Sequence, residues 1–419
     1  MQIRQLLHSI RQLFILCVLP AVAVLSARAA STTKILHSFA GGADGEYIDS
    51  DLVTDAAGNI YGSSVQGGTF GGGTVFEVTP AGVHTVLYNF TGGADGGEPY
   101  KGVTFDAQGN LYGTAVTGGG GSCEGGCGVV YKLANSGGTW TQSVIHTFTG
   151  GNDGSGPGSG VTFDNHGNLY GTTPTGGAKG QGVIYQLKPG ASGWSLSVLH
   201  TFTGGNDGAG GSAGRLIFDA AGNIYGTATV GGANGDGTVF ELSLVEGRWQ
   251  LKTLYAFKDQ PDGALPYGGV VLDKSGNLYG TTYYAGANDV GTVYKLTRGA
   301  NSWTETVLYS FKGGTDGSSP ISTLVADSAG NLYGTTSDGG GGCGCGVIFK
   351  MTPKANGGWV ESVPYRFTGA PNPGFAYNGM VVDAFGNFYG TTVHGGATND
   401  GTVYKFTPLE KGEPWFSTR

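Results

Sequence analysis

Four cysteines in two close pairs are the side chains best suited to covalent or metal chemistry in this chain. The first pair is Cys123 and Cys127, and the second is Cys343 and Cys345. A structural zinc site takes four ligands and would need both pairs together. The pairs fall in the second and sixth of seven repeats, which are not neighbours in a ring, so distance disfavours pairing between them. We therefore predict the local disulfides Cys123–Cys127 and Cys343–Cys345, formed in an oxidising compartment, and no metal site.

A second set of candidate ligands is an Asp-Gly pair that recurs in six of the seven loops between repeats. A ring of carboxylates could bind calcium through oxygen ligands. Calcium loops usually gather several acidic residues, however, whereas most of these loops offer one. The pattern therefore favours Asp-Gly turns, in which the carboxylate accepts hydrogen bonds from nearby amides. The six aspartates are Asp44, Asp95, Asp153, Asp207, Asp262 and Asp316.

No set of residues has the pattern of a catalytic site. An activated nucleophile, a carboxylate pair or a metal cluster would be the expected signature. The histidines His37, His146 and His200 share one repeated position with tyrosines, which indicates packing rather than ligation. Glycine is so frequent that no phosphate-binding loop stands out. We predict no catalytic residue and no cofactor, which favours a protein that is not an enzyme without deciding the question.

Side chains that break the repeat near the expected central channel are the candidates for ligand binding. Four tyrosines come just before the first strand of their repeats, and their rings could stack on sugar rings. The alternative is that they are exposed aromatic residues covering joints between repeats, since apolar surface is common on any protein. The predicted ligand-binding residues are Tyr47, Tyr100, Lys101, Arg215, Tyr267 and Tyr377.

The element that must position these residues is the motif D-x-x-G-N-[LIF]-Y-G-[TS], which occurs seven times. Its Asp-x-x-Gly-Asn segment suits a three-residue hairpin loop with Gly in the left-handed conformation. Because the motif tyrosine repeats identically, we interpret it as packing between repeats. The motif begins at Asp55, Asp106, Asp164, Asp219, Asp273, Asp327 and Asp383.

Each repeat contains four short strand-like runs. The first precedes the hairpin loop, the second follows it, and the other two come later in the repeat. The motif asparagines lie 51 to 58 residues apart, a period typical of propeller blades and too long for a solenoid rung. The sequence thus predicts an all-β fold: a seven-bladed β-propeller of four-stranded antiparallel blades over residues 30–408. Residues 34–39 resemble the end of a fourth strand. We expect this N-terminal strand to close the ring as the outer edge of the last blade.

Two of the connections in each repeat are long and variable, whereas the hairpin loop is tight. One long connection links the second and third strands, and the other runs to the next repeat. Because successive strands alternate in direction, both long connections emerge on the same face. We place any binding site on that face, at the mouth of the channel.

Composition and charge limit the partners. The 419 residues include 84 Gly, and the formal net charge is −8, which argues against nucleic acid and anionic lipid. Residues 1–29 have a basic end, an apolar run and an Ala-x-Ala site, the pattern of a secretory signal peptide. Its removal makes the chain more acidic by three charges and leaves no membrane segment. Residues 409–419 form a C-terminal tail, in which Trp415 stands where a seventh outer-strand Trp would fall.

The repeats resemble the glycine- and valine-rich extracellular tandem repeat called GloVer, found in secreted bacterial proteins. The resemblance rests on blocks such as Gly291-Thr292-Val293-Tyr294-Lys295-Leu296-Thr297. It implies secretion, to the medium or the periplasm, and no established activity. We expect a monomeric binding or surface-interaction module for carbohydrate or a cell-surface protein. The alternatives are a polysaccharide lyase or hydrolase acting at the channel mouth, and a structural protein of the extracellular matrix.

Overall fold

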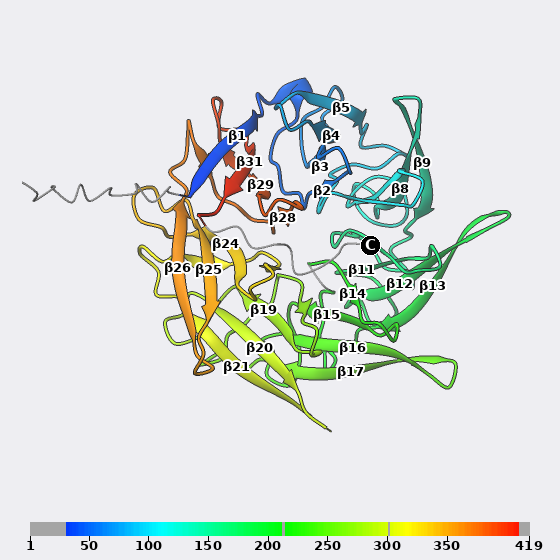
Figure 1. Cartoon of the computed structure of the whole chain (residues 1–419). Helices are drawn as coiled ribbons and strands as arrows, with labels where there is room; N and C mark the ends of the chain where they lie inside the picture. The colour runs from blue at the N-terminus through cyan, green and yellow to red at the C-terminus, as the bar shows by residue number, and fades with distance from the viewer. Residues whose placement is uncertain (1–30, 212–213, 301, 410–419) are drawn as a thin grey trace, which may run out of the picture. The chain divides into compact units, whose positions relative to one another are not determined.

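Residues 31–211, 214–300 and 302–409 are described by a computed structural model of the chain. The predicted signal peptide (1–29), Trp415 and nearly all of the predicted tail (409–419) lie outside these residues. Within them, six four-stranded antiparallel sheets and one five-stranded antiparallel sheet are arranged as seven blades around a central axis (Figure 1). The predicted all-β, seven-bladed propeller is therefore confirmed. Among the described residues, the single helical element is the 3-10 turn η1 (Gly42–Asp44).

Blades 1 to 4 each follow the chain from the innermost strand outward. Blade 1 has β2 (Val53–Thr54), β3 (Ile60–Ser64), β4 (Thr74–Val78) and β5 (His84–Asn89); blade 2 has β6 (Val103–Phe105), β7 (Leu111–Ala115), β8 (Val129–Ser136) and β9 (Thr139–Thr147). Blade 3 has β10 (Thr162–Phe163), β11 (Leu169–Thr173), β12 (Val183–Gly190) and β13 (Gly193–Thr201); blade 4 has β14 (Ile217–Phe218), β15 (Ile224–Ala228), β16 (Thr238–Val245) and β17 (Arg248–Ala256).

Blades 5 to 7 keep this order with two local additions, the strand β22 and the short β27–β30 pair. Blade 5 has β18 (Val271–Leu272), β19 (Leu278–Thr282), β20 (Thr292–Arg298) and β21 (Trp303–Ser310). Blade 6 has β22 (Ser318–Pro320), β23 (Val325–Ala326), β24 (Leu332–Asp338), β25 (Val347–Pro353) and β26 (Trp359–Arg366). Blade 7 has β28 (Val381–Val382), β29 (Phe388–Thr392), β31 (Thr402–Thr407) and β1 (Thr32–Ser38), beside β27 (Pro373–Gly374) and β30 (His394–Gly395).

The N-terminal strand β1 is the outer strand of blade 7. It pairs antiparallel with β31, from Thr32 opposite Thr407 to Ser38 opposite Thr402. Leu36, within β1, and Phe39, just beyond its end, pack in one cluster with residues of blade 1. Strands from the two ends of the described chain therefore share one sheet, and the seam between blades 7 and 1 has a core like the other seams.

The motif aspartate organises each hairpin, as blade 5 illustrates. Asp273 Oδ1 accepts hydrogen bonds from the backbone N–H groups of Ser275 and Asn277, both at 2.8 Å. Its Oδ2 accepts from Asn277 Nδ2 at 2.8 Å and from the Tyr279 hydroxyl at 3.1 Å. Gly276 has φ +79°, a conformation that glycine adopts without steric cost. The motif thus places four donors around one carboxylate.

The second motif glycine is required for a different reason, which is space. Gly280 lies directly opposite Tyr294 in the neighbouring strand. A Cβ at Gly280 would clash with the Tyr294 hydroxyl oxygen. The aromatic ring therefore packs over the glycine. The corresponding partners in the other blades are also aromatic: Phe76, Tyr131, Tyr185, Phe240, Phe349 and Tyr404.

The core of the described propeller is seven separate clusters, each between two adjacent blades. The motif tyrosine faces the next blade: Tyr279 of blade 5 packs with blade 6, and its ring centroid lies 6.1 Å from that of Trp359. The buried apolar surface therefore lies between blades, which leaves the axis for other residues.

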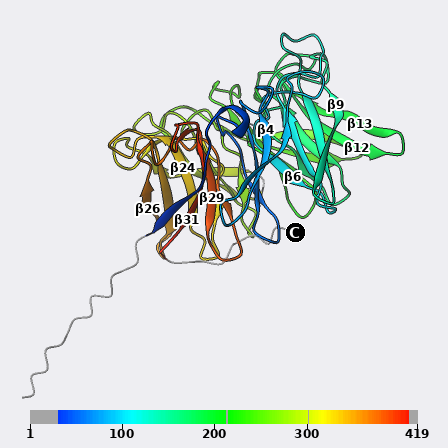
Figure 2. The same ribbon diagram turned by 90° about the horizontal axis from the view of Figure 1, so that it is seen from above.

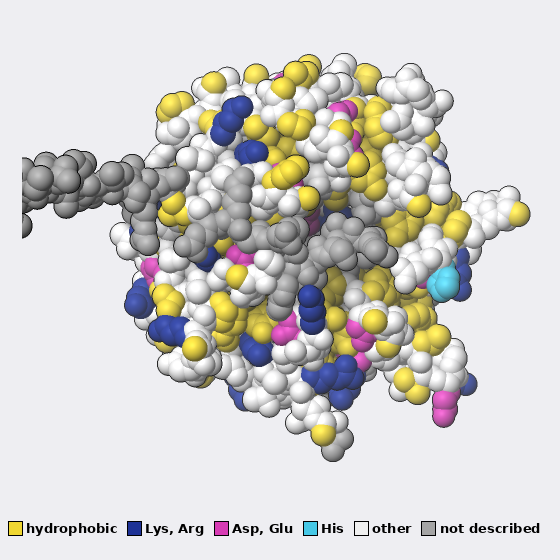
Figure 3. All heavy atoms as spheres, in the orientation of Figure 1, with side chains coloured by type: hydrophobic (Ala, Val, Ile, Leu, Met, Phe, Trp, Pro, Cys, Tyr) yellow, Lys and Arg dark blue, Asp and Glu magenta, His cyan; other side chains and the backbone are white. Residues whose placement is uncertain are grey.

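Figure 2 shows the ring from its side. On the described surface that faces the viewer in Figure 3, positive and negative side chains are interspersed.

Candidate functional site

The segments that lead into the innermost strands bring unrepeated side chains to the axis. Several of these segments contain a non-glycine residue with positive φ, including Tyr47 (56°), Leu265 (57°) and Phe375 (61°). Such conformations are uncommon for residues other than glycine and gather at functional sites. Counted back from the motif aspartate, Asp49, Tyr100, Tyr267, Ile321 and Tyr377 occupy one equivalent position in blades 1, 2, 5, 6 and 7.

Lys101 links three blades at this level of the channel. Its Nζ donates to Asp49 Oδ1 of blade 1 at 3.0 Å and to Asn378 Oδ1 of blade 7 at 2.5 Å. The Lys101 and Asp49 side chains are 15% and 14% exposed. Burial acts to lower the pKa of Lys101, but Asp49 and Asp51 outweigh it, so the pKa is raised. Lys101 is therefore a fixed cation at neutral pH.

Arg215 lies deeper and spans from blade 4 to blades 1, 2 and 3. Its Nη2 donates to the carbonyl oxygens of Lys101 at 2.9 Å and Val103 at 2.8 Å, and its Nη1 to that of Val161 at 3.5 Å. Its Nε is 3.6 Å from Asp51 Oδ2. Burial lowers the pKa of Arg215, which Asp51 opposes. Most of the Arg215 donors are thus taken by protein groups.

The space along the axis is small at the level of Lys101. A cavity of about 10 Å³ is lined by side chains that include Asp51, Lys101, Tyr267, Tyr377 and Asn378, and by its volume it holds about one water. A larger cavity of about 270 Å³ has a mostly apolar lining from the innermost strands, together with Asp51 and Arg215. A ligand larger than water therefore does not fit at the level of Lys101, and the larger cavity lies further along the axis, among the innermost strands beside Arg215.

Tyrosines surround Asp49 at this mouth. Burial raises the pKa of Tyr47, Tyr100 and Tyr377, and the charge of Asp49 adds to the effect in all three; Tyr100 reaches about 12. These hydroxyls are therefore neutral donors at neutral pH. Other aromatic residues extend the group: the Tyr267 and Tyr283 ring centroids are 5.4 Å apart, edge to face. Those of Tyr47 and His394 are 6.3 Å apart. We call Tyr47, Tyr100, Tyr267 and Tyr377 the mouth tyrosines.

Three of the six predicted residues, Lys101, Tyr267 and Tyr377, line the small cavity. Tyr47 and Tyr100 lie close enough to Asp49 to feel its charge, and the role of all five in binding remains a prediction. Arg215 lies beneath them and contacts backbone carbonyls. Sequence reasoning missed Asp49, Asp51 and Asn378, which complete the arrangement. Their positions in the repeat could have identified two of them. Asn378 occupies in blade 7 the position that Lys101 has in blade 2, and Asp51 occupies in blade 1 the position that Arg215 has in blade 4.

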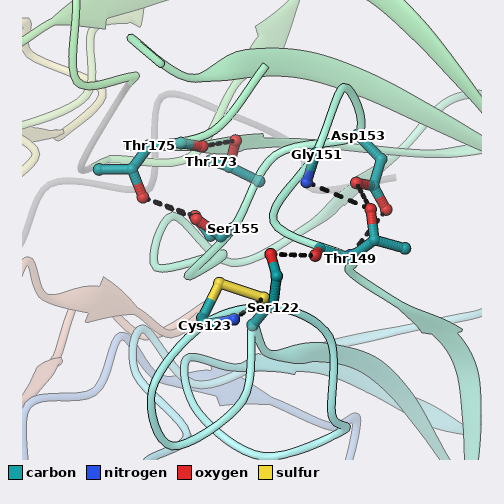
Figure 4. The surroundings of a disulfide bond; sticks show 9 residues. Ser122, Cys123, Thr149, Gly151, Asp153, Ser155, Thr173 and Thr175 are labelled. Carbon is teal, nitrogen blue, oxygen red and sulfur yellow. Dashed lines mark hydrogen bonds between the residues drawn. A yellow bond between two sulfur atoms is a disulfide. The ribbon is translucent and has the colours of Figure 1, made fainter. Parts of the chain in front are cut away.

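Two local disulfides are present, Cys123–Cys127 and Cys343–Cys345, with Cα–Cα distances of 5.1 and 5.3 Å. In Figure 4, the first lies beside the loop that begins blade 3. Ser122, next to Cys123, donates through its backbone N–H and its Oγ to the carbonyl of Thr149, at 3.1 and 3.0 Å. The disulfide thus fixes a long loop of blade 2 against the next inter-blade loop.

The Asp-Gly loops use their carboxylates within the loop. Asp207 Oδ2 accepts from the backbone N–H of Thr203 at 3.0 Å and lies 2.9 Å from His200 Nε2. The Thr203 hydroxyl donates to Asp207 Oδ1. The loops of Asp95 and Asp153 repeat these contacts. These hydrogen bonds support the turn interpretation.

Comparisons with known proteins give a family and a fold. Residues 120–303 and 212–416 match the model of the Gloeobacter/Verrucomicrobia repeat. None of the curated proteins searched matches the chain. The extracellular domain of a protein assigned as a one component system from B. thetaiotaomicron is similar at 9% identity and TM-score 0.53, over 87% of this chain and 39% of that one. This chain therefore spans about two fifths of that protein.

A protein from Lactobacillus plantarum is similar at 13% identity and TM-score 0.51, over 83% of this chain and 98% of that one. At such identities the likeness shows the fold alone. Among the described residues, no helix has the length and apolar character needed to cross a membrane.

Proposed function

We propose that this chain, which belongs to the Gloeobacter/Verrucomicrobia repeat family, is an extracellular binding module that holds a neutral carbohydrate at its channel mouth. Family membership agrees with the GloVer resemblance of the repeats and brings no activity with it. The proposal therefore depends on the site. The observation that carries it is the convergence of the mouth tyrosines, from blades 1, 2, 5 and 7, around the Asp49–Lys101–Asn378 group.

Aromatic rings and fixed polar groups together form the chemistry that recognises a sugar. A ring face packs against the apolar face of a pyranose, while hydroxyl, amide and carboxylate groups bond its hydroxyls. The mouth tyrosines supply rings and neutral hydroxyl donors. Asn378 is 2% exposed, and its Nδ2 has no hydrogen-bond partner, so a donor is available beside the cavity of about 10 Å³.

The charges of the channel favour a neutral ligand over an anionic one. Lys101 is paired with Asp49, and Arg215 lies beside Asp51. Neither cation is therefore left to attract a uronate or sulfate. Glu98 adds a negative charge close to Tyr100. A strongly anionic glycan would meet net repulsion at this mouth.

An extracellular location is supported by three observations. Disulfides persist mainly in oxidising compartments, and the propeller is similar in fold to an extracellular domain. Residues 1–29 have the pattern of a secretory signal. Expression in a bacterium followed by N-terminal sequencing of the exported protein checks this. We expect a mature chain that begins at Ala30, and retention of the intact N-terminus in the cytoplasm contradicts the location.

The test of the binding site uses the mature protein on an array of neutral and acidic glycans, with and without calcium. We expect selective binding to neutral glycans. Tyr100→Ala and Tyr267→Ala should each weaken it at least about tenfold, which corresponds to about 1.4 kcal/mol. Phe385→Ala is the matched control, because Phe385 is an exposed aromatic residue in the hairpin turn that starts at Asp383, away from the mouth.

The alternatives appear as different outcomes of the same experiment. Binding followed by release of shortened oligosaccharide identifies a polysaccharide-acting enzyme. Binding that Phe385→Ala reduces as much as Tyr100→Ala places the site elsewhere. No binding to any glycan overturns the carbohydrate proposal and leaves a protein ligand or a structural role in the matrix.

A further inference from the structure

Two histidines and an aspartate meet at the seam between blades 7 and 1, away from the channel. His37 lies on β1, Asp44 ends η1, and His84 begins β5. His37 Nε2 is 3.0 Å from Asp44 Oδ2, and His84 Nδ1 is 3.0 Å from Asp44 Oδ1. One ligand atom from each residue lies within 4.8 Å of the other two. We call these three residues the seam triad.

The seam triad modifies a contact that recurs at other seams. Elsewhere the loop aspartate meets one Tyr or His from the preceding blade, as in Tyr88–Asp95 at 2.9 Å and His200–Asp207 at 2.9 Å. The strand position equivalent to His84 carries no other histidine in the described blades. Its occupants are Thr33, Gln142, Leu196, Leu251, Glu305 and Glu361. A second imidazole therefore enters the group only at the seam between blades 7 and 1.

The geometry of the seam triad suits a small tetrahedral cation. The two imidazole rings are stacked, with centroids 4.2 Å apart and planes 12° from parallel, and both direct a nitrogen at one carboxylate. In a tetrahedral zinc site with bonds of about 2.0–2.1 Å, ligand atoms lie about 3.3 Å apart. The nitrogen–oxygen separations of 3.0 Å are close to that spacing. Because a metal ion lies in the plane of each imidazole that binds it, one of the two stacked rings has to rotate to admit the ion.

Burial and access also agree with a ligand role. The His84 side chain is 8% exposed, and burial favours the neutral imidazole, which is the form that binds metal. The Nε2 of His84 has no hydrogen-bond partner. No hydrogen bond at Nε2 therefore determines whether that nitrogen carries the proton. The side chains of His37 and Asp44 are 19% and 25% exposed, which leaves a path for the ion and a fourth position for water.

We propose that His37, Asp44 and His84 bind a divalent cation of the zinc class and thereby join the N-terminal strand β1 to blade 1. Two imidazoles and one carboxylate are ligands that Zn²⁺ and its first-row neighbours accept, and that Ca²⁺ and Mg²⁺ do not prefer. Because the ion would contact β1, the following loop and β5, its binding would stabilise the folded chain by mass action. The site is independent of the carbohydrate proposal.

The experiment titrates the metal-free mature chain, without a histidine tag, with Zn²⁺ in a calorimeter and follows its thermal unfolding. We expect one Zn²⁺ per chain and a melting temperature that rises with Zn²⁺ and returns with a chelator. Co²⁺ in place of Zn²⁺ should give the visible absorption of a tetrahedral site. Ca²⁺ should give neither effect.

Matched variants separate this site from other histidines. His84→Leu introduces the residue that blades 3 and 4 carry at the same position, Leu196 and Leu251, and should weaken Zn²⁺ binding at least 100-fold. Asp44→Asn is a second variant with little change in size. His200→Leu removes a similar His–Asp pair that lacks a second imidazole, and should leave Zn²⁺ binding unchanged. Leu251→His places an imidazole beside His200 and Asp207, and should raise the stoichiometry to two.

Each result decides for or against the site. One Zn²⁺ that is lost in His84→Leu and Asp44→Asn, and kept in His200→Leu, supports it. Absence of Zn²⁺ binding by the wild-type chain overturns it. Binding that survives in His84→Leu, or that His200→Leu removes, also overturns it, because the ion would then be held by other residues.

Discussion

The two ends of the innermost strands follow opposite rules. At the hairpin end, seven blades use the same aspartate, asparagine and tyrosine, and the aspartate's acceptors are filled from within six residues. At the channel end, equivalent positions hold Asp49, Tyr100, Tyr267, Ile321 and Tyr377. The hairpins are separated around the ring, so each can use identical chemistry.

The channel residues, in contrast, converge on one axis. Seven identical charges there would repel one another, and seven identical rings would compete for one volume. The residues that do converge are complementary instead, as in the pairs Lys101–Asp49 and Arg215–Asp51. The comparison teaches that repeated contacts build the scaffold of this protein, and that broken symmetry marks the place for a ligand.

The largest effect is expected from removing a cation at the axis. Arg215→Met should destabilise the fold by about 3 kcal/mol, because Asp51 and the carbonyls of Lys101 and Val103 lose a partly buried partner. Urea unfolding measures the change. Arg248→Met, at an exposed outer-strand position, should stay within about 0.5 kcal/mol of wild type. Equal effects of the two variants would remove the distinction between the axis and the periphery.

A smaller effect is expected at one hairpin, because the motif acts blade by blade. Asp273→Ala should cost about 2 kcal/mol, since four donors lose a charged acceptor. Tyr279→Phe, which removes one of the four bonds, should cost about 1 kcal/mol. The same urea experiment applies. Asp164→Ala, the same substitution in blade 3, tests whether the blades are equivalent. A loss of unfolding free energy very different from that of Asp273→Ala would show that they are not.

The last expected effect depends on pH and concerns unrepeated acids at a seam position. Burial, with a nearby aspartate, raises the pKa of Glu305 and of Glu361 to about 7 from the usual 4.5. The folded chain therefore holds these protons more tightly than the unfolded chain does. Their contribution to stability is full below about pH 4.5 and is lost as the pH rises to about 7.

Replacing both acids by glutamine, the residue that blade 2 carries at this position as Gln142, should flatten this dependence. Melting temperatures between pH 5 and pH 8 measure it, and the wild-type chain should lose more stability over that range than the double variant. Glu124→Gln, at an exposed loop position, should keep the wild-type profile. Parallel profiles for wild type and the double variant would contradict the raised pKa values.

The blades could be predicted from the amino-acid sequence alone. The hairpin depends on contacts between residues two to six positions apart, such as Asp273 with Ser275 and Tyr279, and such contacts can be read from spacing. The period of the motif then gave seven blades, and the disulfides link cysteines only four and two residues apart. The breaks in the repeat also identified the mouth tyrosines and Lys101 as candidates, although not their partners.

The contacts between unrepeated side chains could not be predicted in this way, because they depend on how the ring closes. Lys101 reaches Asn378, 277 residues away, because the ring brings blades 2 and 7 to one axis. Arg215 contacts carbonyls 112 and 114 residues earlier for the same reason. His84 faces His37 only because β1 lies at the outer edge of blade 7, beside blade 1. A repeat sequence fixes what each blade contains, whereas the closure of the ring fixes which unrepeated residues come within reach of one another.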